Sequence, residues 1–198
     1  MRYGSGHKEE TRKKILDIAS RRFRKEGVEA VGVASLMADA GLTHGGFYAH
    51  FKSKDDLVAA ALNCALAESS DHIKAIAEGG EKPLETYIRA YLSPRHRDAT
   101  GEGCSFAALA AELARHAGPG RDAALDGLAP YLSWIGSLLP ASDPASARRQ
   151  ATALFSLLMG TLQLSRLATD RAHSDSILET GVKTALDLVS TFKGAPTL

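Results

Sequence analysis

Hydrophobic residues recur every three or four positions along most of the chain, which is the spacing of one face of an α-helix. In the first such stretch, Ile15, Ala19 and Phe23 share a face, and Gly27 follows as a stop signal. This pattern predicts helices over residues 11–26, 33–40, 43–51, 53–66, 84–92, 104–116, 122–139, 143–165 and 175–192. Because the alternation typical of strands is missing from the sequence, we expect an all-α protein of about nine helices.

Several helix boundaries are marked by particular residues. Ser53 and Asp56 have the spacing of a capping box at the start of a long helix, and Asp143, followed by a proline, has the pattern of an N-cap. Pro130 is expected to kink or split the helix that contains it. The polar segment of residues 93–103 is predicted to be a loop.

Composition narrows the class of protein. Hydrophobic residues make up 44% of the chain and charged residues 24%, with no run of the roughly 18 apolar residues that span a membrane. The N-terminal segment also lacks the apolar core of a signal peptide, so we expect a cytoplasmic protein without a membrane partner. Cys64 and Cys104 are too few for a disulfide framework and are not spaced as zinc ligands. Reduced thiols, no metal and no cofactor are therefore expected.

Charge gives weak support for nucleic-acid binding. Residues 1–60 contain 11 Lys and Arg against 8 Asp and Glu, whereas the rest of the chain contains 13 against 15. An excess of this size is too small for a protein that coats DNA without sequence preference. Catalytic motifs are missing from the sequence, since it has no phosphate-binding glycine loop, HExxH pair or nucleophile elbow. No catalytic residue is predicted, and a helical enzyme is the lowest-ranked alternative.

The most informative segment is residues 36–51, which has the form of a helix-turn-helix. Gly41 can adopt the positive φ that a tight turn between two short helices requires, and Leu36 and Phe47 supply the internal faces. The helix expected at residues 43–51 begins with small or polar side chains at positions 43–46, so its backbone can approach a DNA groove closely.

Residues 11–66 resemble the DNA-binding region of the TetR family of transcriptional regulators. The resemblance rests on Ile15, Ala19, Phe23, Gly27, the run Ala40-Gly41-Leu42-Thr43, the pairs Phe47-Tyr48 and His50-Phe51, and the run Ser53-Lys54-Asp55-Asp56-Leu57. It implies a homodimer, most simply a repressor, that binds palindromic operator DNA and is released by a small-molecule effector of unknown identity. Residues 43–51 would then form the recognition helix in the major groove.

By matching positions, the residues expected nearest DNA are Ser35, Thr43, His44, Gly45, Gly46, Tyr48 and Lys54. Lys54 would meet a phosphate at a helix N-terminus, while His50 is expected to pack beside Phe51. In this family, a hydroxyl side chain usually caps the helix that here is expected at residues 33–40, and it touches a phosphate. In this sequence the first hydroxyl side chain of that helix is Ser35. Met37 stands where the family commonly has a smaller residue, which indicates local repacking.

The boundary between functions is placed at residue 56, with a DNA-binding domain over 1–56 and an effector and dimerisation domain over 57–198. Apolar stripes on the last two helices predict a four-helix bundle between two copies, with the interface residues Leu154, Leu158, Leu162, Leu178, Val182, Leu186 and Val189. An ordinary internal core is the alternative for the same stripes.

Effectors of helical domains bind between helices with mostly apolar walls. The predicted effector-contacting residues are Tyr87, Tyr91, Cys104, Phe106, Glu112, Tyr131, Trp134, Met159 and Gln163, each of which could equally be core. An alternative function is a thiol-based sensor of oxidants or electrophiles, because Cys104 stands at the expected N-terminus of a helix, where the dipole favours a thiolate.

Overall fold

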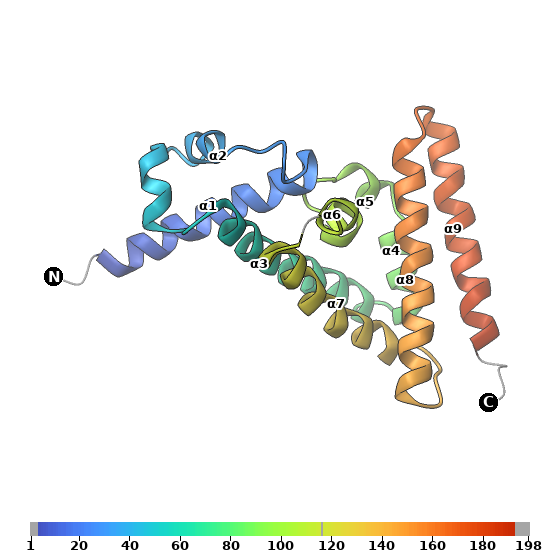
Figure 1. Cartoon of the computed structure of the whole chain (residues 1–198). Helices are drawn as coiled ribbons and strands as arrows, with labels where there is room; N and C mark the ends of the chain where they lie inside the picture. The colour runs from blue at the N-terminus through green and yellow to red at the C-terminus, as the bar shows by residue number, and fades with distance from the viewer. Residues whose placement is uncertain (1–3, 116, 193–198) are drawn as a thin grey trace. The chain divides into compact units, whose positions relative to one another are not determined.

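The computed structural model describes residues 4–115 and 117–192, and every regular element among these residues is helical (Figure 1). The elements are α1 (Gly4–Glu26), α2 (Val33–Asp39), the 3-10 helix η1 (His44–Ala49), α3 (Lys54–Glu78), α4 (Pro83–Tyr91), α5 (Pro94–Asp98), α6 (Ser105–Leu113), α7 (Pro119–Ser137), α8 (Pro144–Leu167) and α9 (Arg171–Phe192). The predicted all-α class is confirmed.

The chain forms two compact units, and the first of them is discontinuous. Unit 1 comprises Met1–Ser69 and Thr100–Gly127, and unit 2 comprises Ser70–Ala99 and Leu128–Leu198. The chain therefore leaves unit 1, builds α4 and α5 in unit 2, and returns to unit 1 with α6. By packing, the helix-turn-helix shares its unit with residues far beyond the predicted boundary at residue 56, because later helices complete its core.

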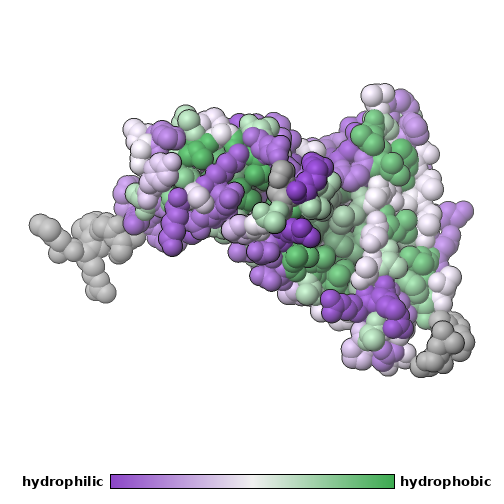
Figure 2. All heavy atoms as spheres, viewed as in Figure 1, coloured by the Kyte–Doolittle hydropathy of each residue, from purple (hydrophilic) through white to green (hydrophobic). Residues whose placement is uncertain are grey.

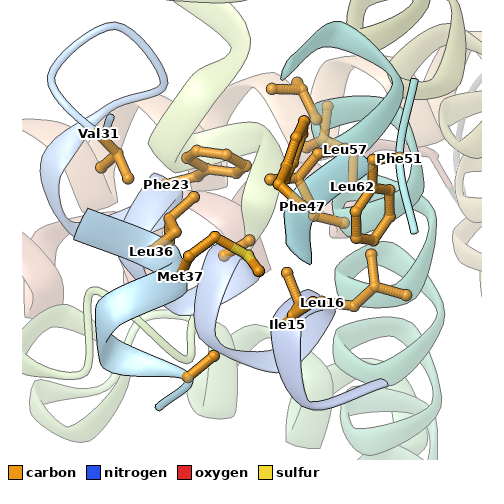
Figure 3. Packing of buried hydrophobic residues seen from close by; sticks show 14 of the residues in the cluster. Ile15, Leu16, Phe23, Val31, Leu36, Met37, Phe47, Phe51, Leu57 and Leu62 are labelled. Atoms are coloured by element: carbon orange, nitrogen blue, oxygen red, sulfur yellow. The ribbon is translucent and has the colours of Figure 1, made fainter. Parts of the chain in front are cut away.

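Hydrophobic side chains of unit 1 meet in one core beneath the helix-turn-helix (Figure 3). Its members from residues 15–62, each at most 4% exposed, include Ile15, Leu16, Phe23, Leu36, Met37, Phe47, Phe51, Leu57 and Leu62. Leu109 of α6 and Ala123 of α7 join the same core. Burial of each large apolar side chain contributes about 1.5–3 kcal/mol, so this core is what holds the short α2 and η1 in place.

Unit 2 is built around α8 and α9, which pack along each other, with α4 against both and α5 against α8. Close packing depends on Gly181, where an added Cβ would lie 2.3 Å from Cγ2 of Thr161. Arg97, only 4% exposed, ties α5 to α9 through an ion pair with Asp175 and a 2.8 Å hydrogen bond to the Ser174 hydroxyl.

Besides shifted helix ends, such as that of α3 at Glu78, three local predictions differ from the structure. Residues 94–98 form the helix α5 within the predicted loop, because the Ser93 hydroxyl accepts a hydrogen bond from the His96 amide and a proline occupies the first turn. α7 continues through Pro130 as one helix and is not split. The predicted third helix is a 3-10 helix, in keeping with the poor helix propensity of its two adjacent glycines.

The predicted caps of two long helices are confirmed. The Ser53 hydroxyl accepts from the Asp56 amide at 3.1 Å, and the Asp56 carboxylate accepts from the Lys52 amide at 3.0 Å. Asp143 accepts from the amides of Ala145 and Ser146 at 2.9 and 3.0 Å. The Ser146 hydroxyl and amide together hold the pKa of the Asp143 carboxyl at about 2.

Candidate nucleic-acid interface

The turn of the helix-turn-helix is formed as its glycine predicts. Gly41 has φ +72°, and the chain reverses through hydrogen bonds from its amide to the Ala38 carbonyl and from the Leu42 amide to the Met37 carbonyl, at 2.9 and 2.8 Å. Phe47 anchors η1 from below, since its ring is 2% exposed and stacks on Phe51 at a centroid distance of 5.7 Å. η1 therefore presents a fixed outer face.

Tyr48 dominates this outer face. Its side chain is 67% exposed, although it sits next to the fully packed Phe47. The ring stands edge-on to Phe47 at 5.3 Å and to His44 at 6.3 Å, so neighbouring rings restrict its orientation. An exposed aromatic ring with a hydroxyl at its tip is suited to a phosphate or a base edge.

Gly45 and Gly46 are explained neither by backbone conformation nor by crowding. Neither is among the glycines with positive φ. A Cβ added at Gly45 would meet nothing within 4 Å, and one at Gly46 would touch only Cε of Met37 at 3.6 Å and Oγ1 of Thr43 at 3.8 Å. Glycine has the poorest helix propensity after proline, so the exposed Gly45 suits a surface that another molecule approaches closely, while Gly46 is half-buried.

The remaining predicted DNA residues differ in their freedom to bind a phosphate. Thr43 is exposed and Lys54, half-buried, is the first residue of α3. Ser35 is less free, because its one hydroxyl proton goes to the Gly32 carbonyl at 2.9 Å while Arg22 donates to its oxygen at 3.0 Å. A hydroxyl has a single donor, so Ser35 in this conformation has none for a phosphate.

Two positions singled out in the sequence pack inward. The His50 ring lies 6.4 Å from the Phe51 ring, as expected. Met37 is fully buried, and its methyl end would lie 3.6 Å from a Cβ added at Gly46.

Arg22 has a structural role that the sequence pattern does not reveal. Its guanidinium donates to Glu26 at 2.7 Å and to Asp39 at 2.9 Å, and so braces α1 against α2. These contacts raise its pKa, with the Glu26 hydrogen bond as the largest cause. No spacing rule reveals a partner 17 residues away in another helix.

The predicted effector-contacting residues fall into different units. Cys104, Phe106 and Glu112 belong to unit 1, and Tyr87, Tyr91, Tyr131, Trp134, Met159 and Gln163 belong to unit 2. Of these, the four aromatic residues of unit 2 come together, with the hydroxyls of Tyr87 and Tyr131 at 3.2 Å and the rings of Tyr87 and Trp134 at 5.1 Å. Met159 is half-buried and Gln163 is exposed.

Most of the predicted dimer residues are already covered by their own chain. Leu154, Leu158, Leu162, Leu178 and Val189 are between 0 and 7% exposed in the single chain, and Val182 and Leu186 are half-buried. The five buried residues form the core of unit 2, which is the alternative that the sequence left open. A second stripe of α8 is apolar and exposed instead, with Leu164 at 58% and Leu167 at 77% (Figure 2).

Neither a metal site nor a membrane span is found in the described part of the chain. Residues 4–115 and 117–192 contain no group of three or more His, Cys, Asp and Glu that could hold a metal ion. Among the same residues, no helix is both long and apolar enough to cross a bilayer.

Two short helices joined at Gly41, with an exposed polar and aromatic face on the second, define a helix-turn-helix DNA-binding protein. Residues 15–61 match the model of the bacterial regulatory proteins of the tetR family. These residues therefore carry the DNA-binding region of the TetR family, which the chain shares with transcriptional regulators.

Individual relatives agree with this assignment. The chain is 38% identical over 74 residues to the HTH-type transcriptional regulator TtgR of Pseudomonas putida, a match that covers 37% of this chain and 35% of TtgR. It is 27% identical over 175 residues to the regulator PksA of Bacillus subtilis, covering 85% of both chains. The matched part thus spans only about a third of TtgR.

Solved structures share the fold over nearly the whole chain. Escherichia coli NemR in its reduced form superposes with a TM-score of 0.76 at 21% identity, covering 96% of this chain and all of that one. The TetR-family regulator SCO4454 of Streptomyces coelicolor gives 0.75 at 24% identity, with 93% and 97% covered.

Proposed function

We propose that this protein is a cytoplasmic, homodimeric transcriptional repressor that binds a palindromic operator and is released by a small molecule. The observation that carries the DNA-binding part is the outer face of η1. It combines an exposed Tyr48, the exposed polar residues Thr43 and His44, and a glycine whose missing side chain serves no packing need. No enzymatic activity is part of the proposal.

The second copy of the chain is assigned to the exposed stripe of α8. Ala153, Leu157, Gly160, Leu164 and Leu167 recur at alternating steps of four and three residues, as in a helix seam. A Cβ at Gly160 would meet nothing within 4 Å, so this face has room for a close helix. Covering Leu164 and Leu167 would remove large apolar side chains from water, which favours association.

The small-molecule effector is assigned to the aromatic residues of unit 2. Tyr131 bridges two parts of this cluster, with its ring 5.0 Å from Phe155 and 5.7 Å from Trp134. Aromatic walls with a few hydroxyl groups suit a flat, largely apolar ligand.

The operator hypothesis is tested by selection from a library of random DNA duplexes with the full-length protein. We expect enrichment of a palindrome, with half-sites on one face of the duplex and affinity far above that for random DNA. Placed across a promoter, the selected site should reduce transcription in vitro when the protein is added. Selection that enriches no common sequence would overturn the proposal.

A thiol sensor is the second candidate, because the structure supplies a cation that the sequence neighbours of Cys104 lack. Cys104 occupies the N-cap position of α6, where its side chain makes no capping hydrogen bond, and it is half-buried. The Arg24 side chain is 8% exposed and contacts the residue before Cys104, since its Nη1 lies 3.4 Å from the Gly103 carbonyl oxygen. Its Nη2 donates to the Ser20 hydroxyl at 2.9 Å. Burial lowers the pKa of this guanidinium, and the negative charge of Glu68 opposes that shift. A nearby cation favours a thiolate.

Alkylation by iodoacetamide tests this candidate within one chain. Cys64 is the internal control, since burial raises the pKa of its thiol. We expect Cys104 to react faster than Cys64 and Arg24→Gln to slow only Cys104. Alkylation should then release the selected duplex from the wild type and not from Cys104→Ser. Equal reaction rates of the two thiols, or equal release in both proteins, would rule out the thiol sensor.

A further inference from the structure

The loop between α1 and α2 is held by a carboxylate from a distant helix. Oε2 of Glu112 accepts from the Val28 amide at 3.0 Å, and Oε1 accepts from the Glu29 amide at 2.8 Å. These partners are 84 and 83 positions apart in the sequence. Both oxygens of one side chain on α6 thus bind two successive N–H groups of the loop, and all of these residues lie in unit 1.

The contact between Glu112 and the loop depends on a carboxylate at residue 112 and a glycine at residue 27. Two successive N–H groups outside a helix need acceptors, and a carboxylate forms stronger hydrogen bonds with them than a neutral group does. Glu112 is the one acidic residue of α6. Gly27 has φ +88°, and a Cβ there would lie 3.1 Å from Oε2 of Glu112. The loop therefore needs glycine both for its conformation and for the approach of the carboxylate.

The loop in turn sets where α2 begins. Gly32, at the N-cap of α2, provides no side-chain hydrogen bond. The loop enters the core at Val31, which is fully buried, and from there the chain runs directly into α2. Arg22 braces α2 from α1 through Asp39. The helix-turn-helix is thus fixed by one polar contact from α1 and by another, through the loop, from α6.

The contact of Glu112 with the loop matters because α6 is joined through the chain to unit 2 on both sides. α6 follows residues of unit 2 through a connection at residues 99–104 and leads into α7, which re-enters unit 2 after Gly127. A change in unit 2 can therefore act on α6 through the chain on both sides of it. We propose that Glu112 is a positioning residue through which α6 sets the α1–α2 loop and thereby the recognition helix. This inference rests on the proposed operator binding.

The test compares Glu112→Gln and Glu112→Ala with the wild type, and Asp126→Asn serves as a charge-matched control because Asp126 is an exposed carboxylate of α7 in the same unit. Three quantities are measured well below each melting temperature: amide exchange at Val28 and Glu29, affinity for the duplex selected by the wild type, and affinity for a random duplex. Melting temperatures are measured separately.

We expect amide exchange at Val28 and Glu29 to accelerate in both Glu112 variants. Affinity for the selected duplex should fall about tenfold in Glu112→Ala, which corresponds to about 1.4 kcal/mol, and less in Glu112→Gln, which keeps one acceptor oxygen. Affinity for the random duplex should change little, and Asp126→Asn should match the wild type in all three quantities.

A purely structural role would lower the melting temperature while the folded variants bind the selected duplex as the wild type does, and that result would overturn the inference. Unchanged amide exchange at Val28 and Glu29 would overturn it as well. Failure of the wild type to select any duplex would instead refute the proposed function, so the two failures are distinguishable.

Discussion

Gly45→Ala is expected to change the stability of the fold and the affinity for operator DNA in opposite directions. The fold should accept the new methyl group, because an added Cβ meets nothing within 4 Å and Gly45 is not among the glycines with positive φ. Replacing glycine by alanine at such a position reduces the entropy of the unfolded chain and stabilises by about 0.4–1 kcal/mol. For a chain of this size, the melting temperature should rise by roughly 1–4 °C.

Operator binding should change in the opposite direction. If the exposed face of η1 enters a groove, the methyl group of Gly45→Ala occupies space that a base edge or the DNA backbone would fill. Loss of one good base contact costs about 1–3 kcal/mol, which is roughly a 5- to 150-fold loss of affinity. Gly46→Ala is the matched comparison. Its Cβ would face Met37 and Thr43 of its own chain, so its affinity loss should be smaller.

The assay pairs thermal unfolding with fluorescence anisotropy on the selected duplex, using wild type and both alanine variants at one salt concentration. A higher melting temperature together with weaker binding in Gly45→Ala is the expected result. Wild-type affinity in a stabilised Gly45→Ala would refute the close approach of η1 to DNA. A lower melting temperature in Gly45→Ala would contradict the conclusion that the fold has room for a Cβ at Gly45.

Three further outcomes are expected. Lys54→Ala should weaken binding to selected and random duplexes alike and reduce the slope of log affinity against log salt by about 0.9; an unchanged slope would exclude a phosphate contact. Leu164→Glu should give a folded monomer in sedimentation, whereas Leu158→Glu should unfold the chain because Leu158 is fully buried; a dimer in Leu164→Glu would exclude the α8 stripe. Burial lowers the pKa of His96, so its stability contribution is complete above about pH 6.5 and is lost as the pH falls below that value. Urea midpoints from pH 7.5 to 5 should therefore fall more steeply for wild type than for His96→Gln, and parallel curves would contradict this.

Local features of the fold could be predicted from the sequence because their causes are local. Helix periodicity, the glycine at the turn and the caps at Ser53 and Asp143 each act within a few residues, and the structure has them where the sequence places them. The helix α5 is a partial exception. Its Ser-Pro start is a local signal, but contacts from Arg166 to the carbonyls of His96 and Arg97, at 3.1 Å each, come from about 70 residues away.

The candidate sites were less predictable because periodicity shows that a face is apolar and not which neighbour covers it. α8 carries two apolar stripes, and only packing distinguishes the buried Leu158 from the exposed Leu164. The partners of Glu112 are backbone amides, which leave no trace in side-chain spacing. Arg24 likewise meets Gly103 across 79 positions.

The discontinuity of unit 1 has a consequence for how the protein is made. The residues through Ser69 include the whole helix-turn-helix, yet Leu109 and Ala123 of its core and Glu112 of its loop contact are synthesised later. At 5–20 residues per second, the ribosome needs about 3–12 s to proceed from Ser69 to Gly127. During that interval the helix-turn-helix part of the nascent chain lacks Leu109 and Ala123, so part of its apolar surface is uncovered. A chaperone that shields apolar surfaces would act at this stage. A fragment ending at Ser69 would remain in this unfinished state.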